Sequence, residues 1–234
     1  MSPLLWCRVS SSVSRRFHYF VADEERIMRA KRTLLERIQH RVRVARLNIT
    51  PGVHVDRSIY IAASAKIQIN TDDCVLGGGV RISKGVIISD GVIIAPYGGS
   101  IEIGASAYVG PYCVLYGHGG LTIGRNAMIA AHTIIVAANH AIAQLDVPMG
   151  RQPLTMKGIA IGEDVWIGAG CKILDGVHIG NGTVIGAGSV VTKDIDAHLI
   201  AFGVPAKVAG RRHASSDGEC VRRNGEIAST SHSS

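Results

Sequence analysis

Residues 161–196 read IGEDVW-IGAGCK-ILDGVH-IGNGTV-IGAGSV-VTKDID, which is six hexapeptides in direct succession. An Ile or Val opens each hexapeptide, and Gly stands second in four of them. A period of six is neither the 3.6 residues of an α-helix nor the two residues of a plain strand. It fits a chain in which every six residues form one short strand and one corner. Three repeats then close a triangular coil, which stacks in parallel on the next coil.

The same phase continues upstream of this stretch. Aliphatic residues recur six apart in two blocks, separated by a slip of two residues at GHGGL: Ile103, Val109 and Leu115, then Ile123, Ile129 and Ile135. The next inward position would be residue 141, yet the repeat restarts only at Ile161. We therefore expect an extruded loop over residues 141–160, directly after His140, within a spiral that spans residues 53–200.

The composition agrees with a narrow coiled prism. Apolar residues make up 47% of the chain but aromatic residues only 5%, as expected for an interior of stacked Ile, Val and Leu. A single continuous repeat favours one domain. It is followed by a short segment, residues 201–212, that contains GVPAK, and by a polar tail, residues 213–234, that we expect to be disordered.

The net charge of +7 is concentrated in a basic N-terminal leader, residues 1–52. Residues 1–48 hold 11 Lys or Arg and 4 Asp or Glu, whereas the remaining residues hold 14 of each kind. Six apolar residues fall on one side of a helix expected to begin after Asp23: Ile27, Leu34, Leu35, Ile38, Val42 and Ala45. We expect this side to pack across the open end of the spiral and cover its strand edge.

An alternative for the leader is that its Arg-rich outer face rests on an anionic membrane surface. Nucleic acid is not expected as a partner, because the basic stretch lacks interleaved aromatic residues and any reading motif. No stretch reaches the roughly 18 apolar residues that span a membrane. The five cysteines are odd in number and lack paired spacing, so neither a disulfide framework nor a zinc ribbon is indicated. These features predict a cytoplasmic protein.

The repeat, followed by GVPAKVAGRR at residues 203–212, resembles the C-terminal coils of the hexapeptide-repeat acyltransferases. The maltose, galactoside and polysaccharide O-acetyltransferase branch is the most similar, because VWIG, IGAGSVVTKD and GVPAK occur together and in register. The resemblance implies an all-β fold, a left-handed parallel β-helix of hexapeptide repeats with an N-terminal α-helical segment. It also implies a homotrimer that holds acetyl-CoA in the clefts between neighbouring spirals.

In that family a His before an extruded loop is the catalytic base, and here that residue is His140 in the segment AANH. Asn139 could hold the His140 ring or the oxyanion, or could be a simple corner residue. The resemblance implies that Trp166 lies beside the acetyl and acceptor site. It places the other cofactor-binding positions along the pantetheine arm, at Ala169 and Ala187, and near the adenosine and phosphates, at Thr192, Lys193, Lys207 and Arg211.

The chemistry of acetyl transfer supports this assignment. A thioester is already activated, so the protein needs to supply proximity, a base for the attacking hydroxyl and donors for the developing oxyanion. Histidine titrates near neutrality and can both accept and return a proton. Three further residues are candidates for substrate contact: His118, which the coil count places one coil below His140, Tyr116 and Arg151. Tyr116 also fits a coil surface, and Arg151 also fits a solvated loop.

The sequence therefore predicts transfer of acetyl from acetyl-CoA to a sugar hydroxyl, in polysaccharide or glycolipid biosynthesis, with no metal. An amino-sugar N-acyltransferase on the same fold is the alternative within the enzyme class. A zinc hydratase like the hexapeptide-repeat carbonic anhydrases is a rival of another class. That family pairs two His five residues apart, whereas His132 and His140 are eight apart. A non-catalytic scaffold spiral is the second rival.

Overall fold

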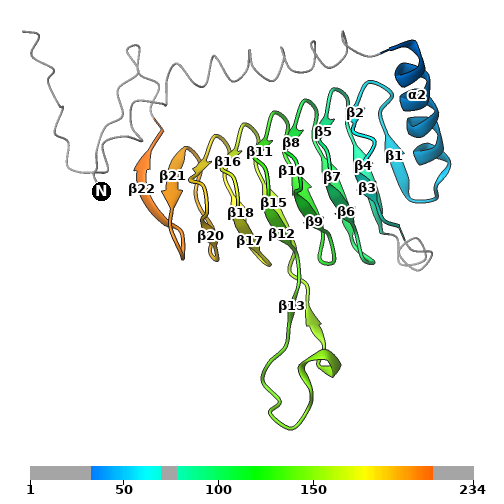
Figure 1. Cartoon of the computed structure of the whole chain (residues 1–234). Helices are drawn as coiled ribbons and strands as arrows, with labels where there is room; N and C mark the ends of the chain where they lie inside the picture. The colour runs from blue at the N-terminus through cyan, green and yellow to red at the C-terminus, as the bar shows by residue number, and fades with distance from the viewer. Residues whose placement is uncertain (1–32, 70–77, 213–234) are drawn as a thin grey trace, which may run out of the picture.

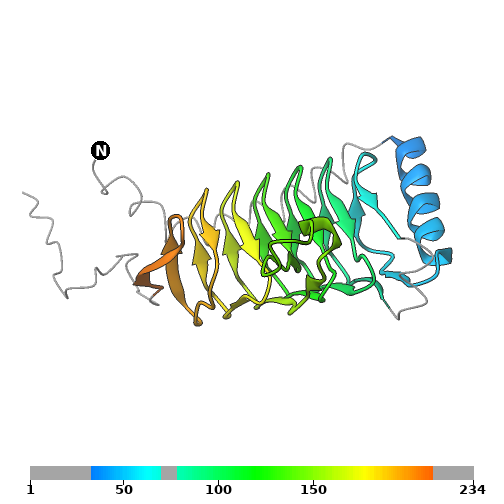
Figure 2. The ribbon, with the colours of Figure 1, turned by 90° about the horizontal axis from the view of Figure 1, so that it is seen from below.

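The chain winds into a three-sided prism of parallel strands, shown in the computed structural model in Figures 1 and 2. The structure describes residues 33–69 and 78–212. The first sheet contains β1 (Val53–Val55), β4 (Gly79–Ile82), β7 (Ser100–Ile103), β10 (Leu121–Ile123), β15 (Ile159–Ile161) and β18 (His178–Ile179). The third sheet contains β3 (Lys66–Ile67), β6 (Ile93–Ala95), β9 (Val114–Tyr116), β12 (Ile134–Val136), β17 (Lys172–Leu174) and β20 (Val190–Val191).

The second sheet is the longest and ends in an antiparallel pair. It contains β2 (Tyr60–Ile61), β5 (Ile87–Ile88), β8 (Tyr108–Val109), β11 (Met128–Ile129), β16 (Trp166–Ile167), β19 (Val184–Ile185), β21 (Leu199–Phe202) and β22 (Lys207–Arg211). The β22 strand runs antiparallel to β21, whereas the other strands of this sheet pair in parallel. The last strand therefore folds back beside β21 as the edge of the second sheet instead of starting another coil.

The register of the strands confirms the predicted repeat phase. Ile103 pairs with Ile123, Ile123 with Ile161, and Ile161 with Ile179, so one column of isoleucines runs up the first sheet. All four side chains are buried. The prism is filled by such columns, and the fold is the predicted left-handed parallel β-helix of hexapeptide repeats.

Between β12 and β15 the chain leaves the prism as a projecting arm (Figure 1). The root of the arm is an antiparallel pair, β13 (Asn139–His140) with β14 (Leu154–Thr155), and a 3-10 helix, η3 (Met149–Arg151), lies beyond it. The Gln152 side chain is buried within the arm, where it donates to the carbonyls of Gln144 and Val147, each at 2.9 Å, and accepts from the Gln144 amide at 3.2 Å. These bonds brace the arm from within.

The helix α2 (Leu34–Ile49) lies across the N-terminal end of the prism (Figures 1 and 2). Its first residue is Leu34, because Thr33 is extended and closes a capping box with Glu36. The predicted cap Asp23, the first predicted apolar residue Ile27 and the predicted tail, residues 213–234, lie outside the described residues.

The prediction of which side of the helix packs on the prism is wrong. Val44 is buried against the first coil, and the Arg43 guanidinium donates to the carbonyls of Ala62, Ala63 and Ala65. Asn48 pairs with the edge strand β1, donating to the Val55 carbonyl and accepting from the Val55 amide, both at 2.9 Å. The predicted apolar side points away from the prism, because the edge of a parallel coil presents carbonyls and amides that polar side chains satisfy.

Candidate functional site

His140 lies at the junction between the rigid prism and the arm. It pairs with Leu154 across the β13–β14 ladder, and the following amide, that of Ala141, donates to the Pro153 carbonyl at 2.9 Å. The side chains of His140 and Asn139 are both exposed, and no hydrogen bond joins them among the described residues. The backbone of His140 is therefore held by the ladder while its imidazole is exposed.

An aromatic cluster occupies the edge of the prism that leads to His140. The ring of Tyr97 stacks on His118 with centroids 4.7 Å apart and meets Tyr116 edge-on at 5.0 Å. The Gly119 amide donates to the Ala137 carbonyl at 3.0 Å, which places His118 one coil below the segment that carries His140. The predicted neighbours His118 and Tyr116 thus lie together, whereas Arg151 lies apart from them in η3 of the arm.

Tyr97, which was not predicted from the sequence, completes this cluster. Tyr97 has a positive φ of 47° in the turn PYGG, a conformation uncommon for a residue other than glycine. The signal that could have identified it is its position in the coil before His118, at the equivalent turn. That comparison needs the length of each coil, which the irregular early repeats obscure.

Ala169 and Ala187 form a smooth shelf along another edge, between the second and third sheets. The Gly188 amide donates to the Ala169 carbonyl at 2.8 Å, so the two alanines occupy equivalent corners of successive coils, and both are exposed. At the equivalent corners Gly170 and Gly188 have φ of +69° and +71°. No side chain larger than a methyl group stands at these four positions, and backbone groups are accessible to a ligand.

In the coils below the shelf, the same corner row carries rings. Tyr112 and His132 stack there with centroids 5.3 Å apart and an interplanar angle of 8°. In the chain, His132 precedes β12 and His140 follows it. The two histidines therefore lie on opposite edges of the third sheet. Within one chain they do not form the start of a His-rich metal site, which counts against the zinc-hydratase alternative.

Cationic side chains gather where the spiral ends. The Ala206 amide donates to the Val190 carbonyl at 2.8 Å, which brings the GVPAK segment beside the strand that leads into Thr192 and Lys193. Lys207 and Arg211 are both exposed on β22, on either side of the register shift that separates their partners Phe202 and Leu199 on β21. The predicted phosphate-binding residues thus belong to two adjoining segments, both solvent-accessible.

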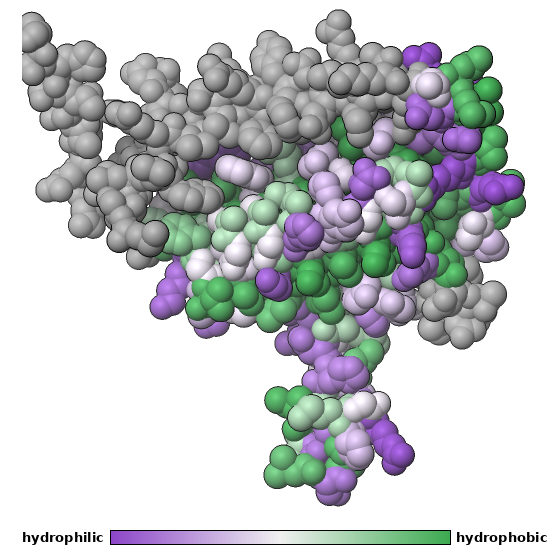
Figure 3. Space-filling view, in the orientation of Figure 1, coloured by the Kyte–Doolittle hydropathy of each residue, from purple (hydrophilic) through white to green (hydrophobic). Residues whose placement is uncertain are grey.

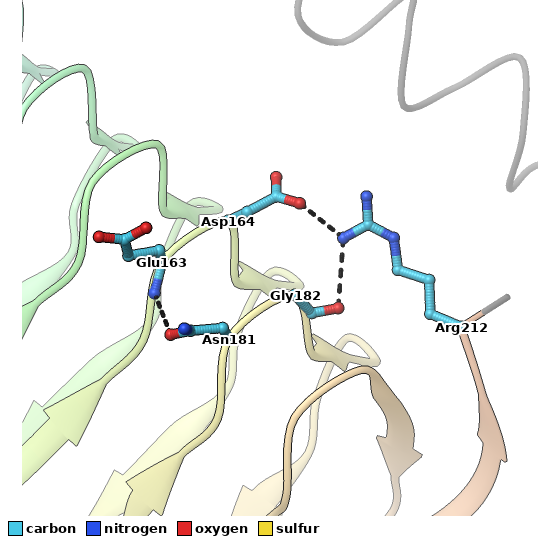
Figure 4. Close-up of polar contacts among 5 residues, drawn as sticks. All are labelled: Glu163, Asp164, Asn181, Gly182 and Arg212. Atoms are coloured by element: carbon cyan, nitrogen blue, oxygen red, sulfur yellow. Dashed lines mark hydrogen bonds and ion pairs between the residues drawn. The ribbon is translucent and has the colours of Figure 1, made fainter. Parts of the chain in front are cut away.

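The C-terminal strand is held by Arg212, which the sequence analysis did not single out. Its guanidinium donates to the Asp164 carboxylate at 2.8 Å and to the Gly182 carbonyl at 3.2 Å (Figure 4). In the same corner, the Asn181 side chain accepts from the Glu163 amide at 2.8 Å. Arg212 thus ties β22, with Lys207 and Arg211 on it, to two coils of the prism.

Trp166 and His140 lie on different faces of one chain. Trp166 belongs to β16 of the second sheet and is half-buried, whereas His140 follows β12 of the third sheet. The single chain therefore presents the predicted residues in separate groups: His140 with the aromatic cluster, the Ala169–Ala187 shelf, Trp166 and the cationic end.

Neither described cysteine is placed to act as a nucleophile. Cys113 and Cys171 are buried, and their thiols donate to the carbonyls of Ala130 and Gly186 at 3.1 and 3.2 Å. Burial raises the pKa of Cys113 to about 11 and raises the pKa of Cys171 as well. A covalent acyl-cysteine intermediate would need an accessible thiolate, which these two residues do not provide.

Comparison with known proteins identifies the family of the chain. A model of the family described as bacterial transferase hexapeptide (six repeats) matches residues 158–193. The chain is 40% identical over 130 residues to Nodulation protein L of Rhizobium meliloti (strain 1021), covering 53% of this chain and 69% of that protein. It is 37% identical over 115 residues to the galactoside O-acetyltransferase of Escherichia coli (strain K12), covering 48% and 54%.

Among solved structures, a variant of AntD, an N-acyltransferase from Bacillus cereus in complex with dTDP and coenzyme A, is similar. The TM-score is 0.56 at 27% identity, over 66% of this chain and 81% of that chain. The protein therefore belongs to the hexapeptide-repeat acyltransferases. The chain spans about half the length of the galactoside O-acetyltransferases it matches.

Proposed function

We propose that the protein transfers the acetyl group of acetyl-CoA to a hydroxyl of a sugar, with His140 as general base. The observation that carries the proposal is the exposed imidazole of His140 at the root of the arm, one coil above the Tyr97–Tyr116–His118 cluster. The names of the relatives, which include galactoside O-acetyltransferases, support the same reaction.

In this reaction His140 takes the proton of the acceptor hydroxyl as its oxygen attacks the thioester carbonyl. The tetrahedral oxyanion needs hydrogen-bond donors. The candidate nearest to His140 along the chain is the side-chain amide of Asn139. Collapse of the intermediate breaks the carbon–sulfur bond, and the imidazolium returns its proton to the leaving thiolate. The products are the acetyl ester and free coenzyme A, so atoms and charge balance without a further reactant.

For the donor, the shelf at Ala169 and Ala187 suits the pantetheine arm, whose amides can pair with exposed backbone groups. The phosphates would meet Lys193, Lys207 and Arg211, with Thr192 near the adenosine and Trp166 near the acetyl group. Coenzyme A in the AntD complex supports this type of donor. Within residues 33–69 and 78–212, no cluster of three or more His, Cys, Asp and Glu side chains is placed to hold a metal ion.

For the acceptor, the Tyr97–His118 pair offers a ring face for a sugar, and the Tyr116 hydroxyl offers a hydrogen bond. Arg151 on the arm suits an acidic sugar or a phosphate. We propose a sugar within a polysaccharide or glycolipid precursor as the acceptor class. The second candidate reaction is N-acylation of an amino sugar, which the likeness to AntD favours.

We propose a homotrimer with each site between two spirals. Exposed apolar residues on the arm support this assembly, since they lack a covering surface in one chain: Ile142, Leu145, Met149 and Met156. A neighbouring spiral would cover them and could bring Trp166 of one copy to His140 of the next. We further propose a cytoplasmic location with peripheral membrane contact. None of the described helices is long and apolar enough to cross a membrane.

The deciding experiment measures free thiol release and product mass with acetyl-CoA over a panel of sugars. The panel includes matched pairs that carry a hydroxyl or an amine at the same carbon. We expect thiol release with the hydroxyl acceptor and an acetyl ester as product, and loss of both in His140→Ala. Release with the amine acceptor alone would select the N-acyltransferase alternative, and no release with any acceptor would contradict the enzyme assignment.

A further inference from the structure

The outer side of α2 is a continuous apolar strip. With a helical turn of about 3.6 residues, six side chains fall within an arc of about 100° on this side. They form the outer strip of α2: Leu34, Leu35, Ile38, Val42, Ala45 and Ile49. All six are exposed, with Leu34 at 75% and Ile49 at 80% of full accessibility. Figure 3 shows hydrophobic side chains at this end of the molecule.

The contacts on the opposite side fix the strip outward. Arg43 donates to three carbonyls of the first coil, Val44 is buried, and Asn48 makes two hydrogen bonds with Val55. The His40 ring accepts from the Ile61 amide at 3.3 Å. Rotating α2 to bury the outer strip would break all of these bonds, so the strip is available to something outside the prism.

Basic side chains border the outer strip on both edges. By helical position, Arg41 lies beside Leu34 and Arg46 lies beside Leu35, and both arginines are exposed. The acidic residue of the helix, Glu36, is on the prism side, where its carboxylate accepts a hydrogen bond from the Thr33 amide. A helix with a wide apolar side and basic edges is suited to lie in a membrane interface, with arginines reaching the headgroups.

We propose that α2 docks through its outer strip on an anionic lipid surface, with the prism standing away from it. This deepens the membrane contact proposed above and does not depend on the acyl-transfer reaction. Charge complementarity selects this occupant over two others. A twofold pairing with a second copy would bring together the basic edges that hold Arg41 and Arg46, and these like charges would repel. Residues 1–32 carry seven Lys or Arg and three Asp or Glu. Their net charge is therefore positive, like that of the edges of the outer strip, and does not complement it.

The test is cosedimentation of the full-length chain with vesicles of phosphatidylcholine alone or with phosphatidylglycerol. Val42→Asn and Val204→Asn form a matched pair, because both remove an exposed valine, 48% and 72% accessible, from different ends of the molecule. We expect wild type to bind the anionic vesicles, Val42→Asn to lower the partition coefficient roughly fivefold or more, and Val204→Asn to leave it unchanged. Arg41→Gln should weaken binding to anionic vesicles only, and added salt should weaken wild type similarly.

Three outcomes would overturn the proposal. The first is equal vesicle binding by both valine variants, or none by wild type. The second is a doubling of mass in light scattering that Val42→Asn abolishes, which would assign the strip to a second copy. The third is Val42→Asn exposing residues 1–32 to protease without changing vesicle binding, which would assign the strip to the leader. Thiol release assayed on the same samples keeps failure of lipid docking distinct from failure of the enzyme assignment.

Discussion

At the scale of single residues, the candidate base lies where the regular repeat is interrupted. The hexapeptide phase predicted the inward positions because each residue there has one role, which is to fill a column. The phase break predicted the arm directly after His140, and the resemblance to the acyltransferases implied the role of that His. Tyr97 escaped prediction because its partner His118 is near only in space, and aromatic stacking leaves no mark in the period.

Replacing His140 by Ala should abolish most turnover and leave the fold and coenzyme A affinity nearly intact. Loss of a general base costs about 10²- to 10⁴-fold in rate. Turnover is measured by thiol release and coenzyme A binding by calorimetry. His54→Ala is the matched control, because His54 is exposed on β1 at the other end of the prism. A variant that retains more than about a tenth of wild-type turnover would remove His140 from the base role.

Replacing Tyr97 by Ala should raise the KM for the acceptor by up to about tenfold and leave the KM for acetyl-CoA unchanged. The reason is that an aromatic stacking contact contributes about 0.5–1.5 kcal/mol beyond its buried area. Tyr112→Ala is the control, since Tyr112 stacks on His132 at a different edge. Equal changes in both constants for Tyr97→Ala would indicate a structural role instead.

Cys113 gives a prediction for stability at high pH. Burial raises its pKa from 9.0 to about 11, so the folded chain holds the thiol proton more tightly than the unfolded chain does. The contribution of the buried Cys113 thiol to the free energy of unfolding is complete below pH 9 and is lost as the pH rises toward 11. The urea midpoint should therefore fall over this window more steeply for wild type than for Cys113→Ala. Parallel slopes for the two proteins would contradict the buried-thiol assignment.

At the scale of elements, periodicity predicted an amphipathic helix but not the direction in which it faces. The apolar positions were identified correctly from Leu34 to Ala45, yet they point outward. A hydrophobic core usually selects the apolar side of a helix, but here the surface to be covered is a row of coil-edge carbonyls. Arg43 and Asn48 match that surface, and a pattern of apolar residues carries no information about it.

The C-terminal strand should depend on the contact between Arg212 and Asp164. Asp164→Asn weakens the bond that ties β22 to the prism, so Lys207 and Arg211 should lose their fixed position. We expect a severalfold rise in the KM for acetyl-CoA, a smaller rise for dephospho-CoA and little change in kcat. Arg125→Gln, which breaks a similar pair with Glu163, is the control. A fall in kcat without a change in KM would count against this positioning role.

At the scale of the whole molecule, the separation of Trp166 from His140 makes a mixing experiment informative. His140→Ala and Trp166→Ala should each be inactive as pure proteins. If each site draws these residues from two copies, co-refolding equal amounts should restore about a quarter of the sites, since each partner is intact half the time. No recovery of thiol release in mixed trimers, verified by mass, would place both residues in one subunit.

The bonds from Arg43 and Asn48 to the first coil also keep α2 over a strand edge at which another chain could add. A stacked coil is a template, and its open edge can accept another β-strand in register. At the opposite end the antiparallel strand β22 ends the second sheet, so the two ends of the spiral are chemically unlike. If α2 came loose, the bare N-terminal edge of one copy could pair with the same edge of a second copy and form a head-to-head dimer.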